Sequence, residues 1–154
     1  MDNALDRVLD ELEKEKDPLT QAQCAEKALS LVTREDDPER WAALQGVLGA
    51  CLVKAPAEHW DESLCERIVA AYQAALSVYT ADSNPEIWSQ TWRNVGATHL
   101  SAIMHRVGDV YEHAKAANNI STGQPRTLDS TTFSPLNRVD AYKACQKLRF
   151  LYIF

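Results

Sequence analysis

The chain has 154 residues, of which 45% are hydrophobic and 25% charged, and its formal net charge is −6 at pH 7. This length suits one domain, and so large a hydrophobic fraction excludes a disordered chain because it supplies a sizeable core. The acidic balance argues against a nucleic-acid partner, and no apolar run approaches the ~20 residues that cross a bilayer, so we expect neither nucleic-acid nor membrane binding.

The first predicted helix covers residues 3–16, and Asp17-Pro18 ends it because the residue before a proline avoids the helical region. Its apolar residues recur at helical spacing and form one stripe, made of Leu5, Val8, Leu9 and Leu12. This acidic, amphipathic start lacks the basic residues and apolar core of a secretory signal. We therefore expect a cytoplasmic protein.

Two further helices are predicted from capping boxes. In a capping box, a Ser or Thr side chain and a Glu or Gln side chain three residues later satisfy free N–H groups at the helix start. The T-x-x-Q at residues 20–23 predicts a helix over about residues 21–34. The S-x-x-E at residues 63–66 predicts another that runs to about residue 79.

Two other helices are predicted from an acidic or amide residue followed by proline. At residues 37–38 and 84–85 the first residue caps the helix, and proline occupies the first helical position, where its missing N–H costs nothing. The third helix should therefore run from Pro38 to about Lys54. The fifth should begin at Pro85 and reach at least Ile103.

The C-terminal third is predicted to contain a short helix, a loop and a last helix. A sixth helical segment over about residues 107–117 either continues the fifth helix or follows a bend at Gly108, where glycine destabilises a helix by ~1 kcal/mol relative to alanine. Residues 118–135 are rich in Asn, Ser, Thr, Gly and Pro and are predicted to form a loop. Residues 136–154 should contain a final helix that packs on or caps the preceding domain, 1–117.

A stretch of the chain repeats itself. Residues 28–50 recur as residues 75–97 without a gap. The matched residues in the first copy are Ala28, Leu29, Ser30, Thr33, Pro38, Glu39, Trp41, Gly49 and Ala50. A period of about 45–50 residues is typical of helical-repeat proteins, in which each helix pair buries its apolar face against its neighbours.

The chain resembles the tetratricopeptide-repeat family over about residues 20–117, in a long-repeat form. The bulky-then-small signature of the first repeat helix is present as Leu48-Gly49 and as Trp92-x-x-Val95-Gly96. The signature of the second helix is present as the segment 25–29, as Tyr72-x-x-Ala75-Leu76 and as Tyr111-x-x-Ala114. The resemblance implies an all-α fold, a short right-handed α-solenoid of antiparallel helix pairs, with the C-terminal helix as a cap.

The resemblance also implies a function. Tetratricopeptide-like arrays bind a peptide or helix of a partner protein in a groove lined by the first helix of each pair. On this basis the partner-binding residues should be Gln45, Trp92, Arg93, Asn94 and His99. We expect Arg93 and Asn94 to grip a peptide backbone or carboxylate. No catalytic residue, cofactor or metal is expected, and the terminal helices are candidates for contacts in a homo-oligomer.

Two other functions remain open from the sequence. An acidic stripe on the first helix would let the protein occupy the basic channel of a nucleic-acid enzyme as an inhibitor; its members are Asp2, Asp6, Asp10, Glu13 and Asp17. A metal-dependent hydrolase would use one face of a continuous helix that carries His105, Asp109, Glu112 and His113, for which ordinary solvated side chains are the alternative.

The cysteines give no motif. Cys24, Cys51, Cys65 and Cys145 are far apart and form no CxxC, which favours small buried thiols in a reducing compartment. Pairing of Cys51 or Cys65 with His59 as nucleophile and base lacks a third, orienting residue.

Overall fold

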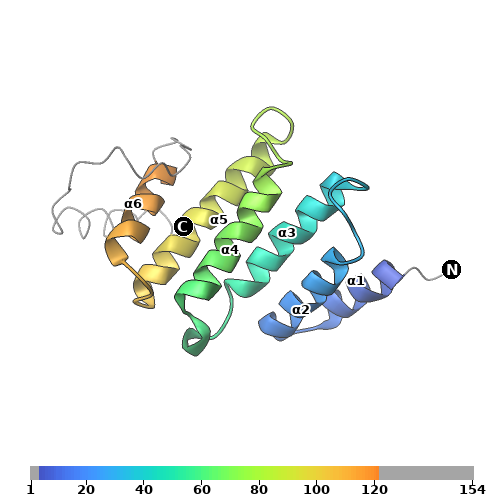
Figure 1. The fold of residues 1–154 in the computed structure, drawn as a ribbon, viewed down its shortest axis with the longest axis horizontal. Helices are drawn as coiled ribbons and strands as arrows, with labels where there is room; N and C mark the ends of the chain where they lie inside the picture. Colours follow the sequence, from blue (N-terminus) through green and yellow to red (C-terminus); the bar gives the residue numbers. More distant parts are fainter. Residues whose placement is uncertain (1–3, 122–154) are drawn as a thin grey trace.

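A computed structural model describes residues 4–121, and within that range the regular elements are all helical (Figure 1). They are α1 (Ala4–Lys14), α2 (Pro18–Leu29), α3 (Pro38–Leu52), the 3-10 helix η1 (Ala57–His59), α4 (Glu62–Leu76), α5 (Pro85–Met104) and α6 (Val110–Ser121). The predicted all-α class is confirmed for this range. None of the described helices is long and apolar enough to span a bilayer.

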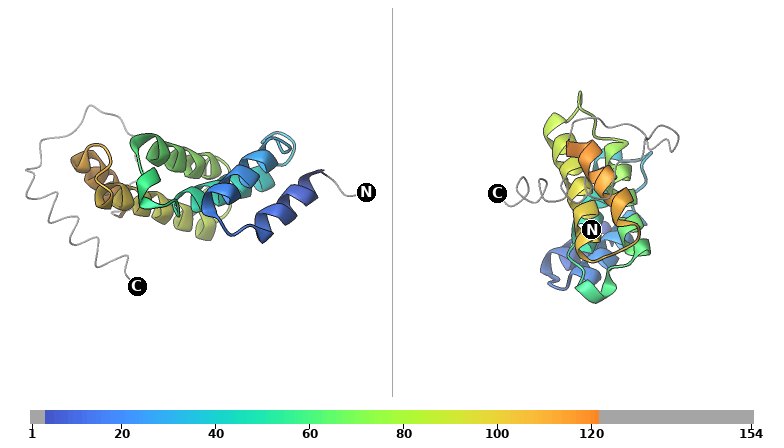
Figure 2. Two further views of the ribbon diagram at one scale, coloured as in Figure 1. Left: turned by 90° about the horizontal axis from the view of Figure 1, so that it is seen from below. Right: turned by 90° about the vertical axis from the view of Figure 1, so that its left-hand side faces the viewer.

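Each helix packs chiefly on the helices that precede and follow it in the chain. Consecutive helices run antiparallel, side by side (Figure 1). In the left view of Figure 2 they alternate between two layers, with α2, α4 and α6 in one and α1, α3 and α5 in the other. An ion pair of 2.7 Å between Arg67 on α4 and Glu26 on α2 joins neighbours within the first layer.

The helix starts are set by aspartates, and both predicted capping boxes are wrong. The carboxylate of Asp17 caps α2, since its Oδ2 accepts from the Thr20 N–H and from the Thr20 hydroxyl, each at 2.8 Å. The carboxylate of Asp61 caps α4 by accepting from the Leu64 N–H at 2.7 Å. In each case an aspartate lies upstream of the box. Its ionised carboxylate accepts hydrogen bonds from backbone N–H groups more strongly than the neutral hydroxyl of the predicted Thr or Ser cap. Each helix therefore begins before its predicted box.

The two aspartate- or asparagine-proline starts are confirmed. Pro38 and Pro85 are the first residues of α3 and α5. Asp37 accepts from the Arg40 N–H at 3.0 Å, as predicted for a cap. Asn84 makes no side-chain cap hydrogen bond, so at α5 the proline and not the asparagine marks the start.

The residues that match in sequence form corresponding turns. After α2 and after α4, the hydroxyls of Ser30 and Ser77 donate to the carbonyl three residues earlier, at 2.7 and 2.6 Å. The hydroxyls of Thr33 and Thr80 accept from the N–H three residues later, each at 3.1 Å. These turns end α2 and α4 earlier than predicted, because the serines act as C-caps.

The largest core cluster lies between α2, α3, α4 and α5, and in it α3 and α4 pack closely at Gly49. It is made of Ala22, Cys51, Leu52, Ala55, Trp60, Leu64, Cys65, Ile68, Tyr72, Val95, Ala102 and Val107. The Tyr72 ring is 2% exposed and lies against Gly49, where a Cβ would be 2.8 Å from the ring atom Cε1. A second cluster, around Leu5, Val8 and Leu44, attaches α1 to α2 and α3.

Of the two alternatives at Gly108, a continued helix or a bend, the structure shows the bend. Arg106 and Gly108 both have φ of 58°, the left-handed region, and the chain turns there from α5 into α6. Helix α6 continues to Ser121, so the loop predicted over 118–135 begins too early. Asparagine lowers helix propensity only slightly, and such preferences are readily overridden by packing. The rest of that loop and the helix predicted within 136–154 lie outside the described residues.

Replacing Gly49 with alanine should destabilise the protein. The added methyl would overlap the buried Tyr72 ring and force α3 from α4, at a cost of about 1–3 kcal/mol in the free energy of unfolding. Gly46→Ala is the matched control, since a Cβ there meets nothing within 4 Å, and it should stabilise α3 by up to about 1 kcal/mol. Urea unfolding measures both variants, and equal effects would contradict the close contact.

Candidate functional site

The predicted partner-binding residues do not form one surface. Arg93 and Asn94 lie on the surface of α5, whereas Trp92 and His99 are turned inward. Gln45 is half-buried on α3, and Arg93 is exposed on α5. Arg93 Nη2 donates to Gln90 Oε1 at 2.8 Å, and Gln90 Nε2 donates to Asn94 Oδ1 at 3.0 Å. Arg93 and Asn94 are thus joined through Gln90 in one polar row on the surface of α5.

Trp92 is packed largely inward. It lies against the largest core cluster, and its indole N–H is buried with no hydrogen-bond partner among the described residues. Only part of the side chain is exposed. Trp92 therefore holds α5 on the core and offers a ligand little more than an edge.

The outer faces of α3 and α5 carry little charge. From Trp41 to the end of α3 the helix contains no Asp, Glu, Lys or Arg, and from Ile87 to the end of α5 it contains only Arg93. Val47 is 37% exposed and Ile87 is 43% exposed on these helices. We call this surface the α3–α5 face; its exposed or half-buried members include Ala43, Val47, Ile87, Gln90, Arg93 and Asn94, whereas Gln45 points to the opposite side of α3 from Ala43 and Val47.

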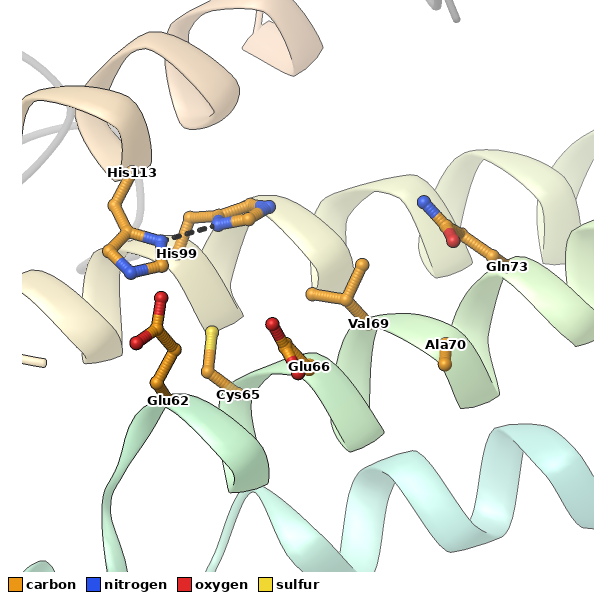
Figure 3. Close-up of a pocket in the computed structure, with 8 residues that line it drawn as sticks. All are labelled: Glu62, Cys65, Glu66, Val69, Ala70, Gln73, His99 and His113. Atoms are coloured by element: carbon orange, nitrogen blue, oxygen red, sulfur yellow. Dashed lines mark hydrogen bonds between the residues drawn. The ribbon is translucent and has the colours of Figure 1, made fainter. Parts of the chain in front are cut away.

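His99, the fifth predicted residue, lies beneath α6 in a cluster with Cys65 and His113. Its Nδ1 is 2.9 Å from Nδ1 of His113, and the ring centroids are 5.2 Å apart with the planes tilted by 39°. One ligand atom each from Cys65, His99 and His113 lie within 4.8 Å of one another. Figure 3 shows the thiol of α4 pointing toward the two imidazoles, which come from α5 and α6.

Antiparallel packing of consecutive helices brings these three residues together. His99 and His113 each lie seven residues from Arg106, in the turn between α5 and α6. Cys65 and His99 each lie seventeen residues from Asp82, in the turn between α4 and α5. Two residues at equal sequence distance from the turn of a helical hairpin lie opposite each other on its two helices. These equal distances were visible in the sequence, but the predicted set of site residues did not use them.

Burial shifts the pKa of two members of the cluster, His99 and Cys65, toward their uncharged forms. Burial, together with the charge of His113, lowers the pKa of His99 to about 4. Burial, with smaller contributions from Glu66 and Glu62, raises the pKa of the Cys65 thiol to about 11. Near pH 7 the structure therefore holds a neutral His99 imidazole and a protonated thiol side by side.

The cluster opens into a pocket of about 310 Å³ between α4 and α6. Besides the cluster it is lined by Glu62, Glu66, Val69, Ala70 and Gln73, all on α4 (Figure 3). Gly108 lies at its edge, where a Cβ would be 3.3 Å from His113 Nε2 and 3.7 Å from Glu62 Oε1. Two carboxylates therefore accompany the thiol and the imidazoles.

The metal-binding set predicted on one continuous helix is wrong. Helix α5 ends at Met104, so His105 and His113 do not share a helix face. The His105 ring stacks on buried Trp60, with centroids 4.9 Å apart and planes 18° apart. Of the predicted set, only His113 lies in the cluster with Cys65.

Cys51 and Cys65, the two cysteines considered and set aside as partners of His59, have other neighbours in the structure. Cys51 Sγ contacts Gln21 Oε1 at 3.8 Å, and Cys65 lies in the cluster with His99 and His113. His59, the base considered for both, is exposed in η1.

No family model, curated protein or solved structure matches this chain. The resemblance to tetratricopeptide repeats therefore stays a prediction.

The low pKa of His99 predicts a pH-dependent stability. Between its ordinary pKa of 6.5 and about 4, unfolded chains bind a proton at this imidazole and folded chains do not, so stability falls as the pH is lowered through this range. For the metal-free protein, we expect a loss of roughly 1–2 kcal/mol at His99 between about pH 7 and about pH 5. His99→Asn should lack this part of the loss.

Urea unfolding of the wild type and of His99→Asn at both pH values measures the difference. His59→Asn is the control, because His59 is exposed. Titration of the carboxylates is common to all three proteins and cancels in the comparison. The same pH slope in His99→Asn and wild type would contradict the prediction.

Proposed function

We propose that this chain is a non-catalytic protein-interaction module of the tetratricopeptide-like, helical-repeat type. In this proposal it binds an amphipathic helix or peptide of a partner protein on the α3–α5 face. Support comes from the alternation of helices between two layers and from the matching turns after α2 and α4. An array whose helices pack mainly on sequence neighbours leaves one side of each layer for ligands.

The observation that carries the proposal is the low charge of the α3–α5 face. Surface helices of globular proteins normally place charged residues on the face away from the core. From Trp41 onward in α3 and from Ile87 onward in α5, Arg93 is the one charged residue at an exposed position; the other exposed positions there hold Ala43, Val47, Ile87, Ser89, Gln90 and Met104. On α4, by contrast, the exposed positions include Glu62, Glu66 and Arg67. An exposed surface depleted in charge is typical of a contact surface for another protein.

The polar row beside this face suits the backbone of a bound peptide. Arg93 and Asn94 are already held by Gln90, so less side-chain entropy is lost when they form hydrogen bonds to a ligand. Acidic residues stand at the start of each helix, with Glu39 on α3 and Glu86 on α5 both exposed. We therefore expect a partner segment with apolar residues at helical spacing and basic residues toward one end.

The free cysteines fit a reducing compartment. Cys24, Cys51 and Cys65 form no disulfide among the described residues. We accordingly propose that the module acts in the cytoplasm.

The competing function, an acidic inhibitor that mimics nucleic acid, gains no support from α1. Asp17, a member of the acidic stripe, is occupied as the cap of α2. Asp10, another member, lies 3.9 Å from the ammonium of Lys14. The stripe is thus interrupted by a cap and by a lysine, whereas a mimic needs a continuous row of free charge.

Charge placed on the α3–α5 face should abolish partner binding. Peptides selected on the intact protein from a random display library should share apolar residues spaced three and four apart. Val47→Glu and Ile87→Glu should each weaken their affinity by about tenfold or more, because a carboxylate would be buried unpaired in the interface. Fluorescence anisotropy of labelled peptides measures the affinity.

Gln23→Glu is the matched control, since Gln23 is exposed on α2 in the other layer and gains the same charge. Circular dichroism checks that all variants fold. Peptides whose affinity is equal for the control and for Val47→Glu would place binding elsewhere. Affinity that collapses with added salt would instead favour the acidic inhibitor.

A further inference from the structure

We propose that Cys65, His99 and His113 form a binding site for a divalent transition-metal ion, with Zn²⁺ the best fit, which fastens α6 to α4 and α5. The site lies under α6, apart from the α3–α5 face, so it extends beyond the proposed partner binding and stands independently of it. His99, predicted as a partner-binding residue, is on this reading a metal ligand.

The donor set selects the ion. One thiolate and two imidazoles are borderline-to-soft ligands that favour Zn²⁺ and neighbouring transition metals over Mg²⁺ or Ca²⁺, which prefer oxygen. Each ligand comes from a different helix, and the backbone of each helix is fixed by the packing of its neighbours. Three ligands on three rigid elements are held close together before the ion arrives.

The distances are close to those that Zn²⁺ needs. With bonds of about 2.3 Å to sulfur and about 2.0–2.1 Å to nitrogen, a tetrahedral ion separates its ligand atoms by roughly 3.3–3.6 Å. The two Nδ1 atoms are 2.9 Å apart, and the three ligand atoms lie within 4.8 Å of one another. The rings must part slightly and the thiol must approach slightly, movements that side-chain rotation supplies.

Binding of the ion requires the loss of one proton, from the Cys65 thiol. The ion replaces the hydrogen bond between His99 and His113, and the neutral imidazoles bind it through ring nitrogen lone pairs. The Cys65 thiol loses its proton to solvent, and the resulting thiolate binds the ion. One thiolate and a divalent cation leave a net charge of +1, which Glu62 and Glu66 on the pocket wall oppose.

The fourth coordination position faces the pocket. Glu62 directs its carboxylate toward the cluster from the first turn of α4 (Figure 3). We assign the fourth ligand to Glu62, bound directly or through a water molecule. Carboxylates occur commonly in zinc sites together with histidine and cysteine.

The physical consequence is a stronger attachment of α6. Among the α6 residues with described side chains, those buried are Ala114 and Ala117, which have little apolar area to bury. A metal ion that bridges α6 to two other helices would contribute its binding free energy to the folded state.

Cobalt titration of the metal-free protein tests the site. Co²⁺ added to the full chain should bind one ion per chain and give a thiolate-to-cobalt charge-transfer band together with the intense visible bands of tetrahedral coordination, and Zn²⁺ should remove both. Cys65→Ser should lose the charge-transfer band. His99→Asn and His113→Asn should each bind Co²⁺ about tenfold or more weakly, because each removes one of three protein ligands.

The controls separate this site from the other thiols and imidazoles. Cys51→Ser removes another buried thiol, Cys145→Ser removes the cysteine outside the described residues, and His59→Asn removes an exposed imidazole. All three should keep the wild-type spectrum. A wild-type protein without the band, or a band that persists in Cys65→Ser and disappears in Cys145→Ser, overturns the proposal.

Thermal unfolding gives a second readout that does not depend on the thiol spectrum. Zn²⁺ at about a hundredfold excess over its wild-type Kd should raise the Tm of the wild type by roughly 5–10 °C, and at the same concentration should raise that of His113→Asn by no more than about half as much. His113 is half-buried on the last described helix, so this variant should fold even if Cys65→Ser does not. An equal rise in His113→Asn would also overturn the proposal.

Discussion

The contact between the Tyr72 ring and Gly49 sets the separation of α3 and α4 at the centre of the described chain. Glycine leaves room for the ring, and the ring in turn joins a core that reaches from Ala22 on α2 to Val95 on α5. Burial of this ring raises the pKa of Tyr72 to about 12, which keeps its hydroxyl neutral at any ordinary pH. Since each helix packs mainly on its sequence neighbours, the separation of α3 and α4 at this contact also affects where α2 and α5 lie.

The same neighbour-to-neighbour packing creates both surfaces to which we assign a proposed function. Alternation between layers leaves α3 and α5 with outward faces that lack charge, and these are where we propose that a partner segment binds. It also lays α6 over the seam between α4 and α5, which brings a thiol and two imidazoles into one pocket. The α3–α5 face is open and could bind a peptide or helix of complementary shape. The pocket under α6 is partly buried and has room for a small ion.

Helices and their order followed from the sequence more readily than their ends did. The prolines at 38 and 85 and the bend at Gly108 are local signals, because they act through φ and a missing N–H in the residues themselves. The capping boxes were wrong because Asp17 and Asp61 lie upstream and start each helix earlier, by accepting from the N–H groups of Thr20 and Leu64. Thr20 and Ser63, the predicted caps, therefore lie inside the first turn of each helix. Choosing between neighbouring caps depends on small energy differences that a pattern does not resolve.

The sequence by itself determined the helical class, the repeated segment and the low charge of two helices, since these depend on residue type and local spacing. The tertiary structure decided which side chains meet. Trp92 packs against the core, His105 stacks on Trp60, and His99 lies beside Cys65 and His113. Those contacts depend on the handedness of each helix hairpin and on the rotation of each helix about its own axis. Packing between residues far apart in the chain fixes both.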